Sequence, residues 1–391
     1  MKLPESCFHI LSRCPDSPDI SSIDAAIRSL QSLKALNATS RHEELILTPL
    51  GKNLAALPCS PKVGRLLIYG SLLSCTLPCS FVAASITSKS PFMTSSDPEV
   101  RKKVAEAKKN FAKSAGRLSD HFAVAEACRI FVTMQQHRLG QSHIRKYCSD
   151  NGLSFDTMTE IITMQKDLLQ GLVDLGFASS VNAAMLETAD CNKHCRDSKV
   201  LSAAFCAGFY PQIARVMKPP TKYVETMGSA FQRENEAREL KLYIPEKPDE
   251  GFSADKSTDD NGDTRGLQRV WVHPSSVNFH TVSFGGSFVI YSDRQITSKP
   301  YLREISEVTA YPILFFGGSL EPNYSTGLVT IDRWIRFSAP GKIVALVQGI
   351  RDTLDQLLDS KIADPSIDIF SNSALQAVVK LISSDGIAKS L

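Results

Sequence analysis

The residues best suited to binding a ligand lie in a β-rich stretch near position 300, where basic and aromatic side chains alternate. Lys299 and Arg303 are an even number of residues apart, so on a β-strand both face the same side, with Tyr301 between them. Cationic side chains contact phosphates and flat rings stack on bases, a combination typical of surfaces that hold a nucleic-acid strand. The alternative is an ordinary solvated strand face, and the spacing alone favours that alternative.

A second group of ligand-binding candidates is the turn His273-Pro-Ser-Ser276. The hydroxyl groups of Ser275 and Ser276 are suited to contacting a phosphate at a loop. The alternative is a turn in which the same side chains bond to the neighbouring backbone. Both interpretations stay open on the residues of the turn alone.

The other reactive side chains do not predict a catalytic or metal site. Asp120 and His121 stand side by side, but they follow Ser119 at a predicted helix start, where Ser and Asp satisfy unpaired backbone amides. A Cys-x-x-His-Cys group begins at Cys191, with Cys206 further on, and this is not a standard zinc spacing. We therefore predict no catalytic residue, metal or cofactor in this chain.

Composition narrows the class of protein. The chain has 391 residues, enough for about two to four domains. The net charge of +3 is small, so any nucleic-acid-binding charge must be concentrated locally. The ten cysteines stop at Cys206, which is unlike a secreted disulfide framework and predicts reduced thiols in a cytoplasmic or nuclear protein. No apolar run is long enough to span a membrane. The N-terminus resembles the middle of a domain, as expected of a fragment.

The elements that must position these side chains change character along the chain. Helical spacing dominates as far as Pro211, and one amphipathic helix, from Asp97 to about Ser114, is strongly basic, which usually marks a solvated face. Short β-rich runs follow at Val270–Val277, Phe288–Tyr291, Thr297–Arg303 and Tyr311–Gly318. A strand is predicted at Ile331–Phe337 and helices at Gly341–Leu358 and beyond Asp364.

These patterns predict an α+β multidomain fold. We expect an N-terminally incomplete winged helix at 1–70, an α-helical bundle at 71–196, a small OB-type β-barrel at 197–338 and C-terminal helices at 339–391. Within the barrel, the proline-rich and acidic stretch 217–269 is predicted to be a long loop or a disordered insertion.

Short sequence motifs occur along the chain within these predicted domains. The motifs are Leu47–Gly51, Leu57–Pro61, Ser88–Phe92, Ser119–His121, Tyr147–Ser154, Ala207–Pro211, His273–Ser276, Tyr291, Thr297–Lys299, Tyr301–Arg303 and Leu314–Gly318. Together they resemble the C-terminal half of DExH/DEAH-box RNA helicases, over roughly residues 5 to 360 and in the family's own order. The ending, from Thr330 to Leu358, is most similar to the RHA-like branch that includes the ribosome-associated initiation helicase.

The resemblance implies a function in binding single-stranded RNA. In the family, the barrel faces the RNA path, which gives a candidate set of RNA-binding residues: Ser275, Ser276, Thr297, Lys299, Tyr301 and Arg303. It also implies a parent helicase whose RecA-like domains bind ATP and Mg²⁺. This chain has no phosphate-loop motif, because Gly51-Lys52 and Gly341-Lys342 lack the required neighbours, and no Asp-Glu-x-His. Its own residues therefore cannot hydrolyse ATP by the family mechanism.

Three functional hypotheses remain. The favoured one is an RNA-binding accessory region that guides single-stranded RNA beside the RecA-like domains. The second, from the enzyme class, is that the chain represents an RNA helicase and ATPase as a whole. The third is a protein-interaction platform, on the ribosome or another ribonucleoprotein or for a glycine-rich activator, for which the acidic stretch 249–263 argues because it repels phosphates.

Overall fold

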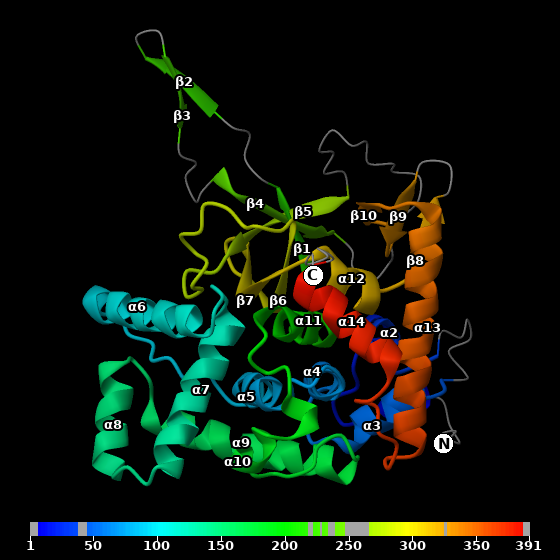
Figure 1. The fold of residues 1–391 in the computed structure, drawn as a ribbon, viewed down its shortest axis with the longest axis horizontal. Coiled ribbons are helices and arrows are strands. Elements are labelled where there is room, and N and C mark those ends of the chain that lie inside the picture. The colour runs from blue at the N-terminus through cyan, green and yellow to red at the C-terminus, as the bar shows by residue number, and fades with distance from the viewer. Residues whose placement is uncertain are drawn as a thin grey trace.

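The computed structural model describes residues 7–37, 45–217, 222–226, 229–233, 239–246, 266–323 and 327–385. Helices form one half of the molecule, a small β-barrel lies against them, and a long C-terminal helix runs along one side (Figure 1). The predicted mixture of a helical bundle, a barrel and C-terminal helices is confirmed.

The N-terminal helices begin where the sequence supplies helix-start residues. They are α1 (Cys7–Leu11), α2 (Ile20–Ser32), α3 (Pro49–Ala56) and α4 (Pro61–Leu72). Thr48 caps α3 by accepting a hydrogen bond from the Gly51 amide at 2.9 Å, and a proline opens both α3 and α4. A β-bridge joins Leu36 to Leu47. Residues 38–44 lie outside the described ranges, and the winged helix stays a prediction.

The bundle follows the predicted helical segments closely. Its elements are α5 (Thr76–Thr87), α6 (Pro98–Ser114), α7 (Asp120–Gln136), α8 (Gln141–Asp150), α9 (Phe155–Asp174), α10 (Ala183–Leu186), the 3-10 turn η1 (Asp190–Asn192) and α11 (Ser198–Phe209). Helix α5 is apolar on all sides because α4, α7 and α9 surround it. Asp97 caps α6 as predicted, accepting from the Glu99 amide at 3.0 Å.

Five strands close the barrel in the order β1-β4-β5-β7-β6. They are β1 (Ile213–Met217), β4 (Lys241–Pro245), β5 (Leu267–Val272), β6 (Phe288–Ile296) and β7 (Pro300–Val308). The interior is apolar and is filled by Ala214, Val216, Leu242, Ile244, Val270, Phe284, Val289, Tyr291, Leu302 and Ile305. Neighbouring strands of the barrel pair antiparallel, except β5 and β7, which pair parallel.

The prediction that 217–269 is a loop insertion was wrong in part. Strand β4 lies inside this range and is a wall of the barrel, with Leu242 and Ile244 in the interior. A hairpin of β2 (Lys222–Thr226) and β3 (Ser229–Arg233) also lies in it and projects away from the barrel (Figure 1). A five-residue strand between polar segments shows too little alternation to be recognised, and pairing on both edges stabilises it. The acidic stretch 249–263 lies outside the described residues.

Two further predictions of strands were wrong. The stretch Tyr311–Gly318 contains a helix, α12 (Ala310–Phe316), because a short apolar run carries no periodicity that separates helix from strand. Ile331–Phe337 is a hairpin rather than one strand. Its arms are β9 (Leu328–Ile331) and β10 (Ile335–Ser338), and β8 (Leu320–Asn323) completes a three-stranded sheet.

The C-terminal helices agree with the sequence. Helix α13 (Gly341–Ala363) includes the predicted Gly341–Leu358, and α14 (Ser373–Ser384) is the predicted last helix. The nine cysteines whose side chains are described form no disulfide among themselves. Within the described part of the chain, no helix has the length and apolar character that crossing a membrane requires.

Candidate nucleic-acid interface

The outer face of the barrel carries most of the predicted RNA-binding residues. Strands β5 and β7 run parallel and adjacent, and Trp271 pairs with Tyr301 in their register. Val270 and Leu302 point into the barrel interior. Because neighbours along a strand alternate between faces, Trp271 and Tyr301 lie on the outside.

Two cations flank the Trp271 ring. The guanidinium carbon of Arg269 and the ammonium nitrogen of Lys299 each lie 5.0 Å from the ring centre. Lys299 is exposed and lies in the β6–β7 turn rather than within the strand, so it reaches this ring from the end of the barrel wall. The indole attracts both charges through its π face, and the Trp271 side chain is partly exposed.

Trp271 and Arg269 were missed by the sequence prediction. The signal was present, because Arg269, Trp271 and His273 occupy alternate positions, with Val270 and Val272 between them. This period of two places the three side chains on one face of a strand. What the sequence did not show is that β5 lies beside β7, which brings this face next to Tyr301.

Tyr301 continues the aromatic surface toward His273. Their ring centres are 5.9 Å apart in an edge-to-face arrangement. Burial lowers the pKa of His273, and the nearby charges of Arg303 and Lys108 add to this effect, so the ring is neutral near pH 7. A neutral imidazole beside a tyrosine extends the stacking surface.

Arg303 and Thr297 are both exposed at this end of the barrel. Arg303 lies opposite Asp293 in the β6–β7 register, and its guanidinium donates a long hydrogen bond of 3.5 Å to Gln295 Oε1. Neither contact immobilises the guanidinium, which stays open to solvent. Thr297 lies in the β6–β7 turn close to Lys299, where its amide bonds to the Lys299 carbonyl at 3.2 Å.

The two serines of the turn after β5 have different positions. Ser275 is exposed, and its hydroxyl lies 2.7 Å from Nδ1 of His273. Ser276 is buried and its hydroxyl donates to Asp120. The expectation that Ser276 faces a phosphate therefore needs correction, because its hydroxyl lies inside the contact between bundle and barrel.

Asp120 forms the centre of that contact. Its buried carboxylate lies 2.7 Å from Lys108 Nζ and accepts hydrogen bonds from the amides of Val277 and Ile305, both at 2.9 Å. Burial alone would raise the pKa of Asp120, but the Lys108 charge, with hydrogen bonds from Lys108, Ser276 and Val277, lowers it below the usual value. The predicted cap role holds for Ser119, which accepts from the Phe122 amide at 3.3 Å, but Asp120 instead holds the barrel on the bundle.

His121 adds a neutral contact to the same junction. Its Nδ1 lies 2.5 Å from the Ser306 hydroxyl and its Nε2 2.7 Å from the Ser292 hydroxyl. The ring stacks on Phe209, with centres 4.8 Å apart. Burial lowers the pKa of His121 to about 4, so the ring stays uncharged at neutral pH.

Helix α6 presents its basic residues next to this junction. Lys108 is buried, and besides Asp120 it bonds the Ser275 carbonyl at 3.1 Å. The remaining lysines and arginines of the helix are exposed: Arg101, Lys102, Lys103, Lys109 and Lys113. The predicted solvated basic face is thus confirmed, and Lys108 anchors it beneath the turn that carries Ser275.

Three family models match the chain in order. The model described as "Helicase associated domain (HA2), ratchet-like" matches residues 60–124, which includes α4, α5 and α6. The model described as "Oligonucleotide/oligosaccharide-binding (OB)-fold" matches 201–320, which includes the closed barrel. The model described as "C-terminal domain in RNA helicases" matches 327–384.

Known proteins show the same relationship. The "ATP-dependent DNA/RNA helicase DHX36" of Bos taurus is 32% identical over 360 residues, which cover 91% of this chain and 31% of the relative. This chain is homologous to the C-terminal region of DExH/DEAH-box helicases. The "DExH-box ATP-dependent RNA helicase DExH1" of Arabidopsis thaliana is 29% identical, covering 98% of this chain and 34% of that protein. The "ATP-dependent RNA helicase DHX29" of Mus musculus is also 29% identical, with coverages of 98% and 26%.

The chain spans about a quarter to a third of the length of these helicases. The matched region contains the helicase-associated helices, the OB barrel and the RNA-helicase C-terminal domain. The family resemblance seen in the sequence motifs is therefore confirmed. The assignment to one branch of the family stays a prediction.

Proposed function

We propose that this chain is the RNA-binding accessory region of an ATP-dependent DExH-box helicase and that its barrel guides single-stranded RNA. The observation that supports this most directly is the outer barrel face, where Trp271 lies between Arg269 and Lys299. Tyr301 and Arg303 extend the same face.

The chemistry of this face suits an unpaired strand. Stacking on an aromatic side chain contributes about 1–3 kcal/mol per base and tolerates any sequence, because every base has a π face. The cations beside the rings would neutralise phosphates and release counterions. The Asp120 and His121 contacts hold the barrel on the bundle, so the strand would meet a preformed surface.

We propose that the partners lie in the parent protein. The RecA-like domains would bind ATP and Mg²⁺ and would form the opposite wall of the RNA channel. A ribosomal or glycine-rich activator partner remains a secondary proposal, and so does a cytoplasmic or nuclear location. The acidic stretch that motivated a protein-interaction platform lies outside the described residues.

A filter-binding titration with single-stranded RNA at two salt concentrations tests the proposal. We expect binding that weakens as salt rises, and the slope of log affinity against log salt should fall by roughly 0.7 in Lys299→Gln, because one phosphate contact is lost. Lys380→Gln, an exposed lysine on α14, is the matched control and should keep the full slope. Absence of binding at low salt, or equal slopes in both variants, would contradict it.

A further inference from the structure

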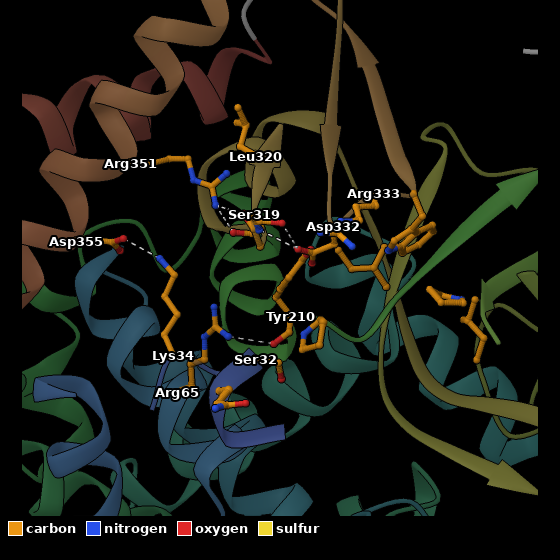
Figure 2. A pocket seen from close by; sticks show the side chains of 18 of the residues that line it. Ser32, Lys34, Arg65, Tyr210, Ser319, Leu320, Asp332, Arg333, Arg351 and Asp355 are labelled. Atoms are coloured by element: carbon orange, nitrogen blue, oxygen red, sulfur yellow. Dashed lines mark hydrogen bonds and ion pairs between the residues drawn. The ribbon is translucent and has the colours of Figure 1, made fainter. Parts of the chain in front are cut away.

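A cavity of about 640 Å³ lies where the N-terminal helices, the barrel and the C-terminal helix meet (Figure 2). This volume is in the range of pockets for small organic ligands. It shares no lining residue with the barrel face described above. Its walls include Lys34 after α2, Arg65 of α4, Tyr291 of β6, Asp332 of the β9–β10 turn and Arg351 of α13.

Arg65 brings an uncompensated positive charge to this cavity. The side chain is only 2% exposed, and Nη1 donates to the Tyr210 carbonyl at 3.1 Å. Its Nε has no hydrogen-bond partner among the described residues. The guanidinium forms no ion pair with a carboxylate of the described residues, and its carbon lies 5.2 Å from the centre of the Tyr69 ring.

Arg351 enters the cavity from α13 as a second buried cation. The side chain, labelled in Figure 2, is 7% exposed. Its Nη2 donates to the carbonyls of Gly317 and Gly318. Its Nη1 has no hydrogen-bond partner in the described part of the chain. Burial lowers the pKa of Arg351, and the nearby charges of Asp355, Asp332 and Asp352 act in the opposite direction.

The carboxylates that line the cavity have other partners. Asp355 pairs with Lys34 at 2.7 Å. Asp332 accepts hydrogen bonds from the Tyr210 hydroxyl and from the Ser319 amide at 2.8 Å. Both guanidinium groups donate to backbone carbonyls, and each keeps one N–H without a partner among the described residues, which marks a place for a hydrogen-bond acceptor such as an anion.

We propose that this cavity binds a small phosphate monoester of about the size of a mononucleotide. The planar N–H forks of Arg65 and Arg351 suit the oxygens of a phosphate, which accept hydrogen bonds from guanidinium groups. Asp352 and Asp355 line the same cavity and would repel a triphosphate. The aromatic rings of Trp334 and Tyr291 provide apolar walls for the rest of the ligand.

The β9–β10 turn positions Asp332 in the cavity wall. Asp332 and Arg333 adopt left-handed backbone angles, with φ of 47° and 66°, although neither is glycine. Positive φ angles are common at the tip of a β-hairpin such as β9–β10. The turn keeps the Asp332 carboxylate against Tyr210 and Ser319, which fixes the wall beside Arg351.

Calorimetric titration of the whole chain with AMP, ATP, inorganic phosphate and adenosine tests the proposal. We expect AMP to bind most tightly, ATP and phosphate more weakly, and adenosine not at all. Arg351→Gln and Arg65→Gln should each lower the AMP affinity about tenfold or more, because a charge-assisted contact is lost. Adenosine binding as well as AMP, or no heat with any of the four, would overturn the proposal.

A second variant guards against misfolding of the buried arginine variants. Asp352 is exposed, and its neutralisation in Asp352→Asn should raise the AMP affinity severalfold by removing a repulsive charge. Misfolding cannot produce tighter binding, so an unchanged or lowered affinity counts against the site. Lys299→Gln should leave AMP binding intact, which separates this site from the proposed RNA surface.

Discussion

Trp271 contributes the largest ring of the barrel face, and its flat surface makes a specific prediction at the residue scale. Trp271→Ala should weaken single-stranded RNA binding by about 1–3 kcal/mol, because one base loses its stacking partner. Trp271→Phe keeps a ring and should retain most of the affinity. Fluorescence anisotropy with a labelled oligonucleotide measures both, and equal losses in the two variants would refute stacking.

Lys108 and Asp120 form a buried ion pair, and Asp120 accepts further hydrogen bonds from the barrel. Lys108→Met leaves the Asp120 carboxylate without its cation, so the free energy of unfolding should fall by about 3–5 kcal/mol. The neighbouring Lys109 is exposed, and Lys109→Met should change it by less than about 0.5 kcal/mol. Urea denaturation followed by circular dichroism gives both values, and similar losses would argue against the pair.

His121 makes stability depend on pH. Its pKa is about 4 in the fold against an ordinary value of 6.5, so between these values the unfolded chain binds more protons than the folded chain. The free energy of unfolding should therefore fall as pH drops from 6.5 to 4, by about 3 kcal/mol in total.

The effect of Asp120 on stability is separated from that of His121 by the pH at which each group titrates. Asp120 has a lowered pKa, so its contribution is lost only as pH falls below its ordinary value of 3.8. Thermal unfolding of His121→Gln across pH 7 to 4 should show a flatter profile than the natural chain. A profile as steep as that of the natural chain would exclude His121 as the cause.

At the scale of elements, two helical glycines differ in the space available for a side chain. A Cβ on Gly208 of α11 would lie 2.6 Å from the Leu66 Cα, so α11 and α4 would have to separate. A Cβ on Gly349 of α13 would meet nothing within 4 Å. Gly208→Ala should destabilise the fold by about 1–3 kcal/mol through overpacking, whereas Gly349→Ala should stabilise it by up to about 1 kcal/mol. Thermal melting of the two variants checks the opposite signs.

At the scale of the whole molecule, the parts share one apolar core. The main cluster joins bundle residues to Phe288 and Val308 of the barrel and to Val347 and Leu354 of α13. Bundle and barrel should therefore unfold together. The fluorescence of Trp271 and Trp334 reports the sheets, and circular dichroism reports mainly the helices. Coincident urea transitions are expected, and two separate midpoints would show independent units.

The helices and their order were determined by the sequence itself. Caps such as Thr48 and Asp97 and the 3.6-residue spacing of apolar side chains are local signals, which act within one or two turns. The cationic and aromatic residues after position 269 were also visible, because strand alternation is local.

Only the tertiary structure decided how distant residues meet. The residues next to Asp120 predict that it caps a helix, yet its partners Val277 and Ile305 lie far along the chain. Strand β4 is recognisable only through its pairing with β1 and β5, and Trp271 meets Tyr301 because β5 lies beside β7. Arg65 and Arg351 line one cavity although nothing in their own segments connects them. Long-range pairing and burial depend on the packing of the whole chain, and no window of sequence contains that information.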